Sequence, residues 1–164
     1  MLTQDELKSK FHYDPDTGLF TYKKSYFKTN IGKVAGENSS TGYILLRVNN
    51  KVYYAHRLAW LYVHGTEPLE LIDHINRIRN DNRIVNLREA SKAENGYNRK
   101  IGNNSSSGIK GISWCVHHKR WVARVSVNKI RKCIGYFRSI SDAESAIADA
   151  RKKYHGEFEY HAKA

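Results

Sequence analysis

A histidine directly follows an aspartate at Asp73-His74, and short amides recur around this pair. A neutral imidazole can take a proton from water near pH 7, because its reference pKa is about 6.5. Aspartate and asparagine oxygens are ligands that hard divalent cations such as Mg²⁺ prefer. Together these residue types predict phosphodiester hydrolysis, in which water loses a proton while a metal ion neutralises the phosphate and stabilises the leaving oxygen. Asparagine occupies positions 76, 80, 82, 86, 95 and 98.

Two elements must position these side chains. The apolar residues around the pair predict a short strand over 71–75, followed by a polar loop. Ser91 and Glu94 have the S-x-x-E spacing of a capping box, so a helix is expected to start at Ser91. This helix brings Asn95, in its first turn, back toward the strand end as a second metal ligand.

The asparagines between the strand and the helix have a different predicted role. Asn86 stands just before an apolar residue, where a short amide hydrogen-bonds loop backbone and holds the histidine rotamer. Asn82 is a rival for this role, with loop formation as its alternative. Asp81 is expected to pair with Arg79 or Arg83.

The stretch resembles the HNH nuclease motif, the ββα-metal fold, and more specifically the phage-type HNH homing and intergenic endonucleases. The motifs that carry the resemblance are "AHRLAW" at 55–60, "DH" at 73–74, "DNRIVNLR" at 81–88 and "AENGYNR" at 93–99. The resemblance covers roughly residues 10–100. Whether such an enzyme nicks one strand or breaks both stays open.

This resemblance implies a role for each matching residue. His74 would be the general base, and Asn86 would brace the loop. Asp73 and Asn95 would bind a single divalent cation, Mg²⁺ with Mn²⁺ as the alternative. Asn95 stands where many relatives have a histidine.

The segment before the motif is predicted to form hairpins followed by a helix. "YDPDTGLFTY" has the Asp, Pro and Gly residues of a tight turn between short strands, and Asn49-Asn50 fits a two-residue hairpin turn. A short helix over 56–64 is expected to end at Gly65. His56 is interpreted as an anchor between hairpin and helix, with DNA contact as the alternative.

The C-terminal segment is predicted to be a three-stranded antiparallel sheet packed on one helix. Strand-like runs lie near 111–116, 120–127 and 130–137, and the helix that follows begins with a second capping box, Ser141 and Glu144, and ends at Gly156. In the middle run, alternate residues form an apolar face and a face with Arg120 and Arg124. This second face is expected to enter a DNA major groove, with a solvated surface as the alternative. The apolar set is Trp121, Ala123, Val125 and Val127; the second set is Arg120, Val122, Arg124 and Ser126.

This segment resembles the ethylene-response-factor type of DNA-binding domain, over about 109–158. The matching motifs are "IKGISW", "KRWVARV", "IGYF" and "SDAESAIADARKKYHG". Arg124 stands where relatives often have an acid, and Cys133 where plant members often have a tryptophan, so their sequence preference is not carried over. The DNA-facing residues that the resemblance implies are Lys110, Ser113, Arg120, Arg124 and Arg131. Arg99 and Lys100, beside the polar linker, are expected to contact phosphates.

Charge and composition agree with a polyanionic partner. The 164 residues include 28 Lys+Arg and 16 Asp+Glu, for a formal charge of +12 and a pI near 9.7. No apolar run approaches the roughly 20 residues of a membrane span, and the N-terminus lacks the apolar core of a secretory signal. Cys115 and Cys133 lack the CxxC spacing of a zinc site, and two reduced, half-buried thiols are expected. These observations predict a cytoplasmic protein, in the host cytoplasm if a phage encodes it.

The sequence thus predicts an α+β protein in two parts. Residues 1–100 would form the HNH nuclease domain, 101–110 a linker, and 111–164 a domain that binds double-stranded DNA. A monomer acting on an asymmetric site is expected, and a dimer remains open. The alternatives are a non-catalytic DNA-binding regulator with a decayed nuclease unit, and an RNA-binding protein.

Overall fold

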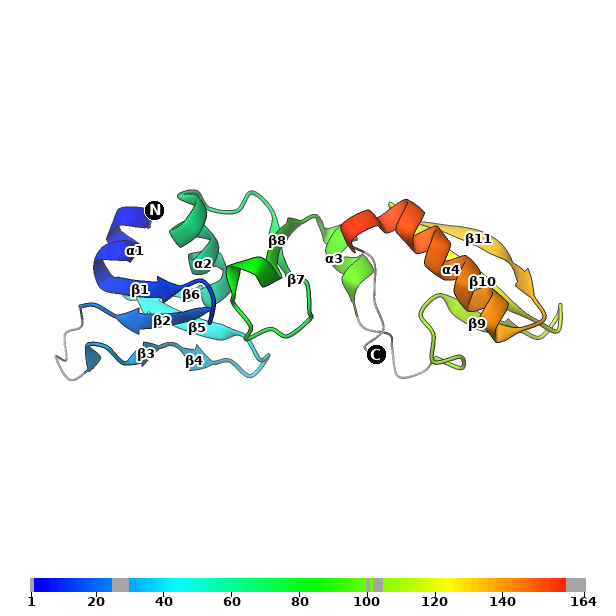
Figure 1. The fold of residues 1–164 in the computed structure, drawn as a ribbon, viewed down its shortest axis with the longest axis horizontal. Helices are drawn as coiled ribbons and strands as arrows, with labels where there is room; N and C mark the ends of the chain where they lie inside the picture. Colours follow the sequence, from blue (N-terminus) through cyan, green and yellow to red (C-terminus); the bar gives the residue numbers. More distant parts are fainter. Residues whose placement is uncertain (1, 25–29, 100, 102–104, 159–164) are drawn as a thin grey trace. The chain divides into compact units, whose positions relative to one another are not determined.

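A computed structural model of the chain describes residues 2–24, 30–99, 101 and 105–158, and it confirms the predicted α+β class. The contacts divide the chain into two compact units, Met1–Ala90 and Ser91–Ala164. This division falls one helix before the predicted linker, because the helix that starts after Ser91 packs with the C-terminal unit. Figure 1 labels the elements of both units.

Small antiparallel sheets and two helices make up the first unit. The strands pair in the orders β1-β2-β3, β4-β5-β6 and β7-β8. In Figure 1, α1 and α2 lie beside each other in this unit. The elements are α1 (Gln4–Lys10), β1 (Phe11–Asp14), β2 (Leu19–Tyr22), β3 (Val34–Ala35), β4 (Glu37–Asn38), β5 (Ile44–Val48), β6 (Lys51–Tyr54), α2 (Ala55–His64), β7 (Leu71–His74), the 3-10 helix η2 (Ile84–Asn86) and β8 (Leu87–Ala90).

The turns of the first unit form where the sequence predicts them. Asn49 and Asn50 join β5 to β6 with φ values of 50° and 62°, the left-handed pair that a two-residue hairpin of this kind requires. Gly65 ends α2 with φ 78°, and its N–H donates to the Leu61 carbonyl. Both predictions are confirmed.

A hydrophobic core under these sheets fixes the position of the loop that follows β7. Leu7, Phe20, Leu46 and Leu58 are among its fully buried side chains. At the edge of this core, the Tyr13 hydroxyl donates to the Asn82 carbonyl over 2.7 Å. The first unit therefore anchors the polar loop from its apolar interior.

The β1–β2 turn presses against the same loop. A Cβ on Gly18 would lie 2.5 Å from the Arg83 nitrogen, and Gly18 also has a φ of 74°. Only glycine allows this approach without displacing backbone. The Ile84 N–H, further along, donates to the Pro15 carbonyl over 3.3 Å. The predicted hairpin thus supports the loop.

A short helix, a three-stranded sheet and a longer helix form the second unit. The strand order is β11-β10-β9, as predicted, and α4 covers one face of the sheet (Figure 1). Ala123, Val125, Ala143 and Ile147 are buried between them. The elements are α3 (Lys92–Asn98), β9 (Ile112–Cys115), β10 (Arg120–Val127), β11 (Ile130–Phe137), α4 (Ile140–His155) and the 3-10 helix η3 (Gly156–Phe158).

The two predicted capping boxes have different outcomes. At α3, the Ser91 side chain accepts from the Glu94 N–H while the Glu94 carboxylate accepts from the Ser91 N–H, so this prediction is confirmed. At α4 the prediction is wrong, because the helix starts two residues earlier. Ser139 is the N-cap, and its hydroxyl accepts from the Ser141 N–H over 3.1 Å. Gly156 ends α4 as expected.

Two expectations about the sheet surface need correction. Val122, predicted on the basic face, is only 1% exposed, because β10 is the central strand and its neighbours Ser113 and Tyr136 flank it. Cys133 is exposed rather than half-buried, while Cys115 is half-buried and both are free thiols.

In the described part of the chain, no helix has both the length and the apolar character needed to cross a membrane.

Candidate functional site

Strand β7 ends on two buried polar side chains. Asp73 and His74 are each 5% exposed. Asp73 stands opposite Arg88 in the β7–β8 register, and its Oδ2 accepts from Arg88 Nε over 3.1 Å and from Nη2 over 2.9 Å. Since both side chains are largely withdrawn from water, this ion pair fixes the carboxylate and offsets the cost of burying its charge.

The His74 ring is enclosed by polar and aromatic groups. Its Nε2 lies 3.4 Å from Asn82 Oδ1. The ring of Tyr43 lies 5.8 Å away, and that of His56 lies 5.0 Å away at 83°. Burial lowers the pKa of His74, because a desolvated imidazole resists protonation, while the hydrogen bond to Asn82 acts in the opposite direction. His74 is therefore neutral near pH 7, the form that accepts a proton.

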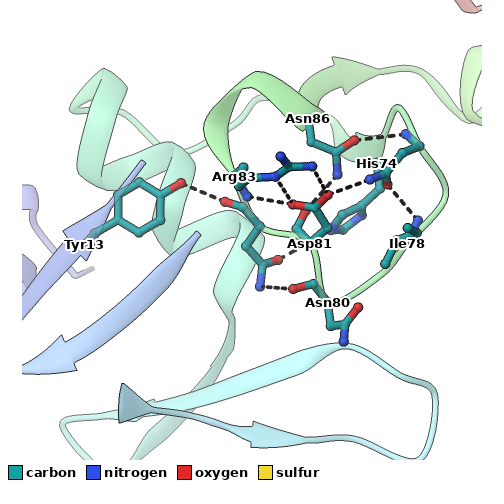
Figure 2. Close-up of polar contacts among 9 residues, drawn as sticks. Tyr13, His74, Ile78, Asn80, Asp81, Arg83 and Asn86 are labelled. Carbon is teal, nitrogen blue, oxygen red and sulfur yellow. Dashed lines mark hydrogen bonds and ion pairs between the residues drawn. The ribbon is translucent and has the colours of Figure 1, made fainter. Parts of the chain in front are cut away.

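The side-chain amide of Asn86 stabilises the polar loop through both its oxygen and its nitrogen (Figure 2). Its Oδ1 accepts from the Asn76 N–H over 2.9 Å, and its Nδ2 donates to the Asp81 carbonyl over 2.8 Å. The Ile75 N–H donates in turn to the Asn86 carbonyl over 2.9 Å. These bonds fix the chain directly after His74.

Asp81 pairs with Arg83 rather than with Arg79. The Arg83 guanidinium donates to both Asp81 carboxylate oxygens, from Nε over 2.8 Å and from Nη2 over 2.6 Å (Figure 2). The Arg83 bond is the main reason that the pKa of Asp81 falls to about 2. Arg79 donates instead to the Thr41 carbonyl over 2.7 Å and lies over the Tyr43 ring.

Asn82 and Asn86 thus have separate contacts. Asn82 is 2% exposed and reaches the His74 ring, whereas Asn86 bonds only loop backbone in the contacts above. Sequence spacing had left the two as rivals for one role. The residues that sequence reasoning undervalued are Arg88, Tyr43 and His56, whose proximity to the pair depends on strand register and on packing across α2.

Asn95 lies in the first turns of α3, in the second compact unit, and is half-buried. A helix of seven residues is too short to be stable alone, so α3 depends on tertiary packing. Tyr97 stacks on His155 at 3.8 Å and 9°, and its hydroxyl accepts from the Asn128 N–H over 2.9 Å. The C-terminal unit therefore fixes the helix that carries Asn95.

The residues predicted to hold a metal ion offer hard oxygen donors. Taken one by one, the carboxylate of Asp73 and the amide oxygen of Asn95 are ligand types that Mg²⁺ and Mn²⁺ accept, so their chemistry fits such an ion. The described residues contain no group of three or more His, Cys, Asp or Glu side chains suited to a metal. Arg88 donates both of its hydrogen bonds to Oδ2 of the Asp73 carboxylate.

The predicted DNA-facing residues differ in exposure. Arg131 is exposed on β11, whereas Ser113, Arg120 and Arg124 are half-buried on β9 and β10. The Lys110 ammonium donates to the carbonyls of Gly96, Tyr97 and Arg99, at the end of α3. Arg99 is exposed, and Lys100 lies outside the described residues.

The segment that contains Asp73 and His74 is similar to a known protein family. Residues 53–97, from β6 through α3, match the family model of an HNH endonuclease, so the predicted resemblance to HNH endonucleases is confirmed for these residues. Protein 3.8 of Escherichia phage T7 is 29% identical over 120 residues, which cover 69% of this chain and 97% of that protein. The predicted likeness to a phage protein is thereby confirmed.

A solved structure is also similar over most of the chain. It is the HNH homing endonuclease I-HmuI, described as binding and cleaving DNA, with 19% identity and a TM-score of 0.43 over 94% of this chain and 88% of that one. The resemblance of residues 109–158 to the ethylene-response-factor domain stays a prediction.

Proposed function

We propose that the protein is a metal-dependent HNH endonuclease that hydrolyses phosphodiester bonds of double-stranded DNA. The observation that carries this proposal is the neutral, buried His74 held beside Asp73 at the end of β7, within the segment that matches the HNH model. The +12 charge of the chain suits a nucleic-acid substrate. We also propose that residues 1–100 carry out cleavage, that 101–110 form a linker and that 111–164 bind DNA.

In this mechanism His74 is the general base. When the Nε2–H group donates a hydrogen bond to Asn82 Oδ1, the lone pair of the neutral ring lies on Nδ1. Nδ1 then takes the proton of the water that attacks phosphorus. Asn82 sets the tautomer, and Asn86 keeps the following loop in place through its two backbone bonds.

HNH nucleases generally use a divalent metal ion. Asp73 and Asn95 are the residues that would hold one here, Mg²⁺ in the first instance and Mn²⁺ as the alternative. When bound, the ion supplies charge neutralisation at the phosphate and stabilisation of the leaving oxygen. Arg88 orients the Asp73 carboxylate through its two hydrogen bonds.

The basic side chains of the C-terminal sheet bind the duplex in this proposal. Arg131 is exposed and Arg120 and Arg124 are half-buried, so their guanidinium groups can clamp phosphates or bond guanine. We also propose DNA contacts for Ser113, Arg99 and Lys110, and for Lys100, which lies outside the described residues. The Lys110 ammonium in addition caps α3. We further propose that the protein is a homing endonuclease encoded by a phage. It would act as a monomer in the host cytoplasm.

The test is incubation of the protein with supercoiled plasmid and with phage genomic DNA, in Mg²⁺, Mn²⁺ or EDTA. We expect nicked or linear product that requires metal and disappears in His74→Ala, while Asn80→Ala, an exposed loop asparagine, cleaves as the wild type does. A gel shift without cleavage in either metal would favour the non-catalytic DNA-binding regulator. Stronger competition by RNA than by duplex DNA would favour an RNA-binding protein.

A further inference from the structure

A second histidine packs against the proposed base and has no part in the mechanism above. His56 lies in the first turn of α2 and is 8% exposed. Its ring is perpendicular to that of His74, at 5.0 Å and 83°. On its other sides it stacks on Tyr54 at 5.3 Å and 18°, and meets Tyr43 at 5.3 Å.

These contacts make His56 part of an enclosure around the base. Tyr43 touches both imidazoles, and Asn82 bonds the His74 Nε2. A ring that is confined by a perpendicular neighbour and a hydrogen bond has few orientations left. Because His56 sits on a helix whose other buried residues belong to the core, its own position is rigid.

Stability alone does not explain an imidazole at this place. His56 Nδ1 is buried and has no hydrogen-bond partner among the described residues. A buried nitrogen without a partner destabilises a fold, whereas a hydrocarbon side chain would fill the space without that cost. Burial lowers the pKa of His56 to about 3, with smaller effects from His74 and Arg57, so the ring is neutral and puts no charge beside His74.

We propose that His56 is a positioning residue for His74, and that its compact imidazole holds the His74 ring in the plane in which Nδ1 faces the attacking water. This inference rests on the proposed function of His74. A six-membered ring at the same place would overpack the 5.0 Å contact and move His74 away from Asn82. An open-chain side chain would leave one side of the ring unsupported.

The proposal is tested with three variants of the full-length protein. His56→Phe replaces the ring with a larger one, and His56→Gln keeps polarity without a ring. His64→Phe is the matched control, since His64 lies exposed at the other end of α2. Cleavage at saturating DNA, DNA affinity, thermal stability and the ¹⁵N signals of the His74 ring are measured for each.

We expect both His56 variants to lose at least about tenfold in kcat with KM for DNA unchanged, and to alter the His74 tautomer signals. The control should match the wild type in all four measurements. Wild-type kcat and unchanged His74 signals in a folded His56→Phe, or in His56→Gln if the first does not fold, would overturn the proposal. Since the ring signals need no turnover, an inactive wild type would contradict the nuclease function separately from this inference.

Discussion

The end of β7 and the outer surface of the β9–β11 sheet use polar residues in opposite ways. At β7, Asp73 and His74 are buried and held by named partners, Arg88 and Asn82. On the sheet, Arg131 is exposed, and the other arginines are only partly covered. One region withdraws its polar groups from water at a cost, and the other leaves them accessible.

The difference matches two physical requirements. Chemistry on a phosphodiester needs a base and ligands in fixed positions, which burial and hydrogen bonds provide. Binding to a duplex backbone needs positive charge that reaches phosphates and displaces counterions, which accessible side chains provide. Four substitutions, whose expected effects decrease in turn, test this contrast.

Asp73→Ala should produce the largest loss of stability. It leaves the Arg88 guanidinium largely buried without its carboxylate partner, and breaking such a pair costs about 3–5 kcal/mol. Urea denaturation measures the change, with Asp16→Ala in an exposed turn as the control. Adding Arg88→Met should restore part of the loss. A change no larger than in the control would contradict the buried pair.

Asn86→Ala should destabilise the loop after β7. It removes the bonds to the Asn76 N–H and the Asp81 carbonyl, at a cost of about 2–3 kcal/mol for two backbone groups that lose partners. Thermal unfolding and cleavage should both be impaired. Asn80→Ala, which removes an exposed amide from the same loop, should have little effect on either. Equal effects of the two substitutions would show that Asn86 does not brace the loop.

Arg131→Ala should weaken DNA binding without unfolding the protein. Removal of one phosphate contact lowers the slope of log Kd against log salt by about 0.9. Fluorescence anisotropy over a salt series measures this slope. Lys152→Ala is the control because it removes the same charge from α4, which packs on the other face of the sheet. Identical salt slopes for the two variants would argue against a DNA-binding sheet surface.

Asp81→Asn should have the smallest effect. The Asp81–Arg83 pair is partly exposed and screened by water, so its loss costs little stability at pH 7. Since the folded pKa of Asp81 is about 2 and its ordinary value is 3.8, its contribution is present above pH 3.8 and is lost as the pH falls toward 2. Acid denaturation of the variant should therefore be less steep between pH 4 and pH 2. Equal slopes would contradict this assignment.

The local patterns of the chain predicted most of its elements. The Asn49-Asn50 turn, the Ser91 capping box and the three C-terminal strands formed as expected, because each depends on a few neighbouring residues. The start of α4 was misplaced since two nearby serines compete for the N-cap, and Ser139 makes the bond. Residue spacing in the sequence alone does not decide which of two nearby serines becomes the N-cap.

The site was only partly predictable for a different reason. Asp73 and His74 stand out as neighbours in the sequence, but Arg88 reaches Asp73 through strand register. His56 reaches His74 across 18 positions, through the packing of α2. Asn82 and Asn86 could not be ranked until the loop backbone was placed. Long-range packing decides these contacts, and no short motif encodes it.

One experiment separates the chemistry at His74 from DNA binding by the sheet most directly. Single-turnover cleavage at saturating duplex DNA and Kd at one fixed salt concentration are measured for the wild type, His74→Ala and Arg131→Ala. We predict that His74→Ala loses about 10²–10⁴-fold in rate with nearly unchanged Kd, and that Arg131→Ala weakens Kd with an unchanged rate. Unchanged cleavage in His74→Ala, or parallel losses of rate and affinity in both variants, would contradict this prediction.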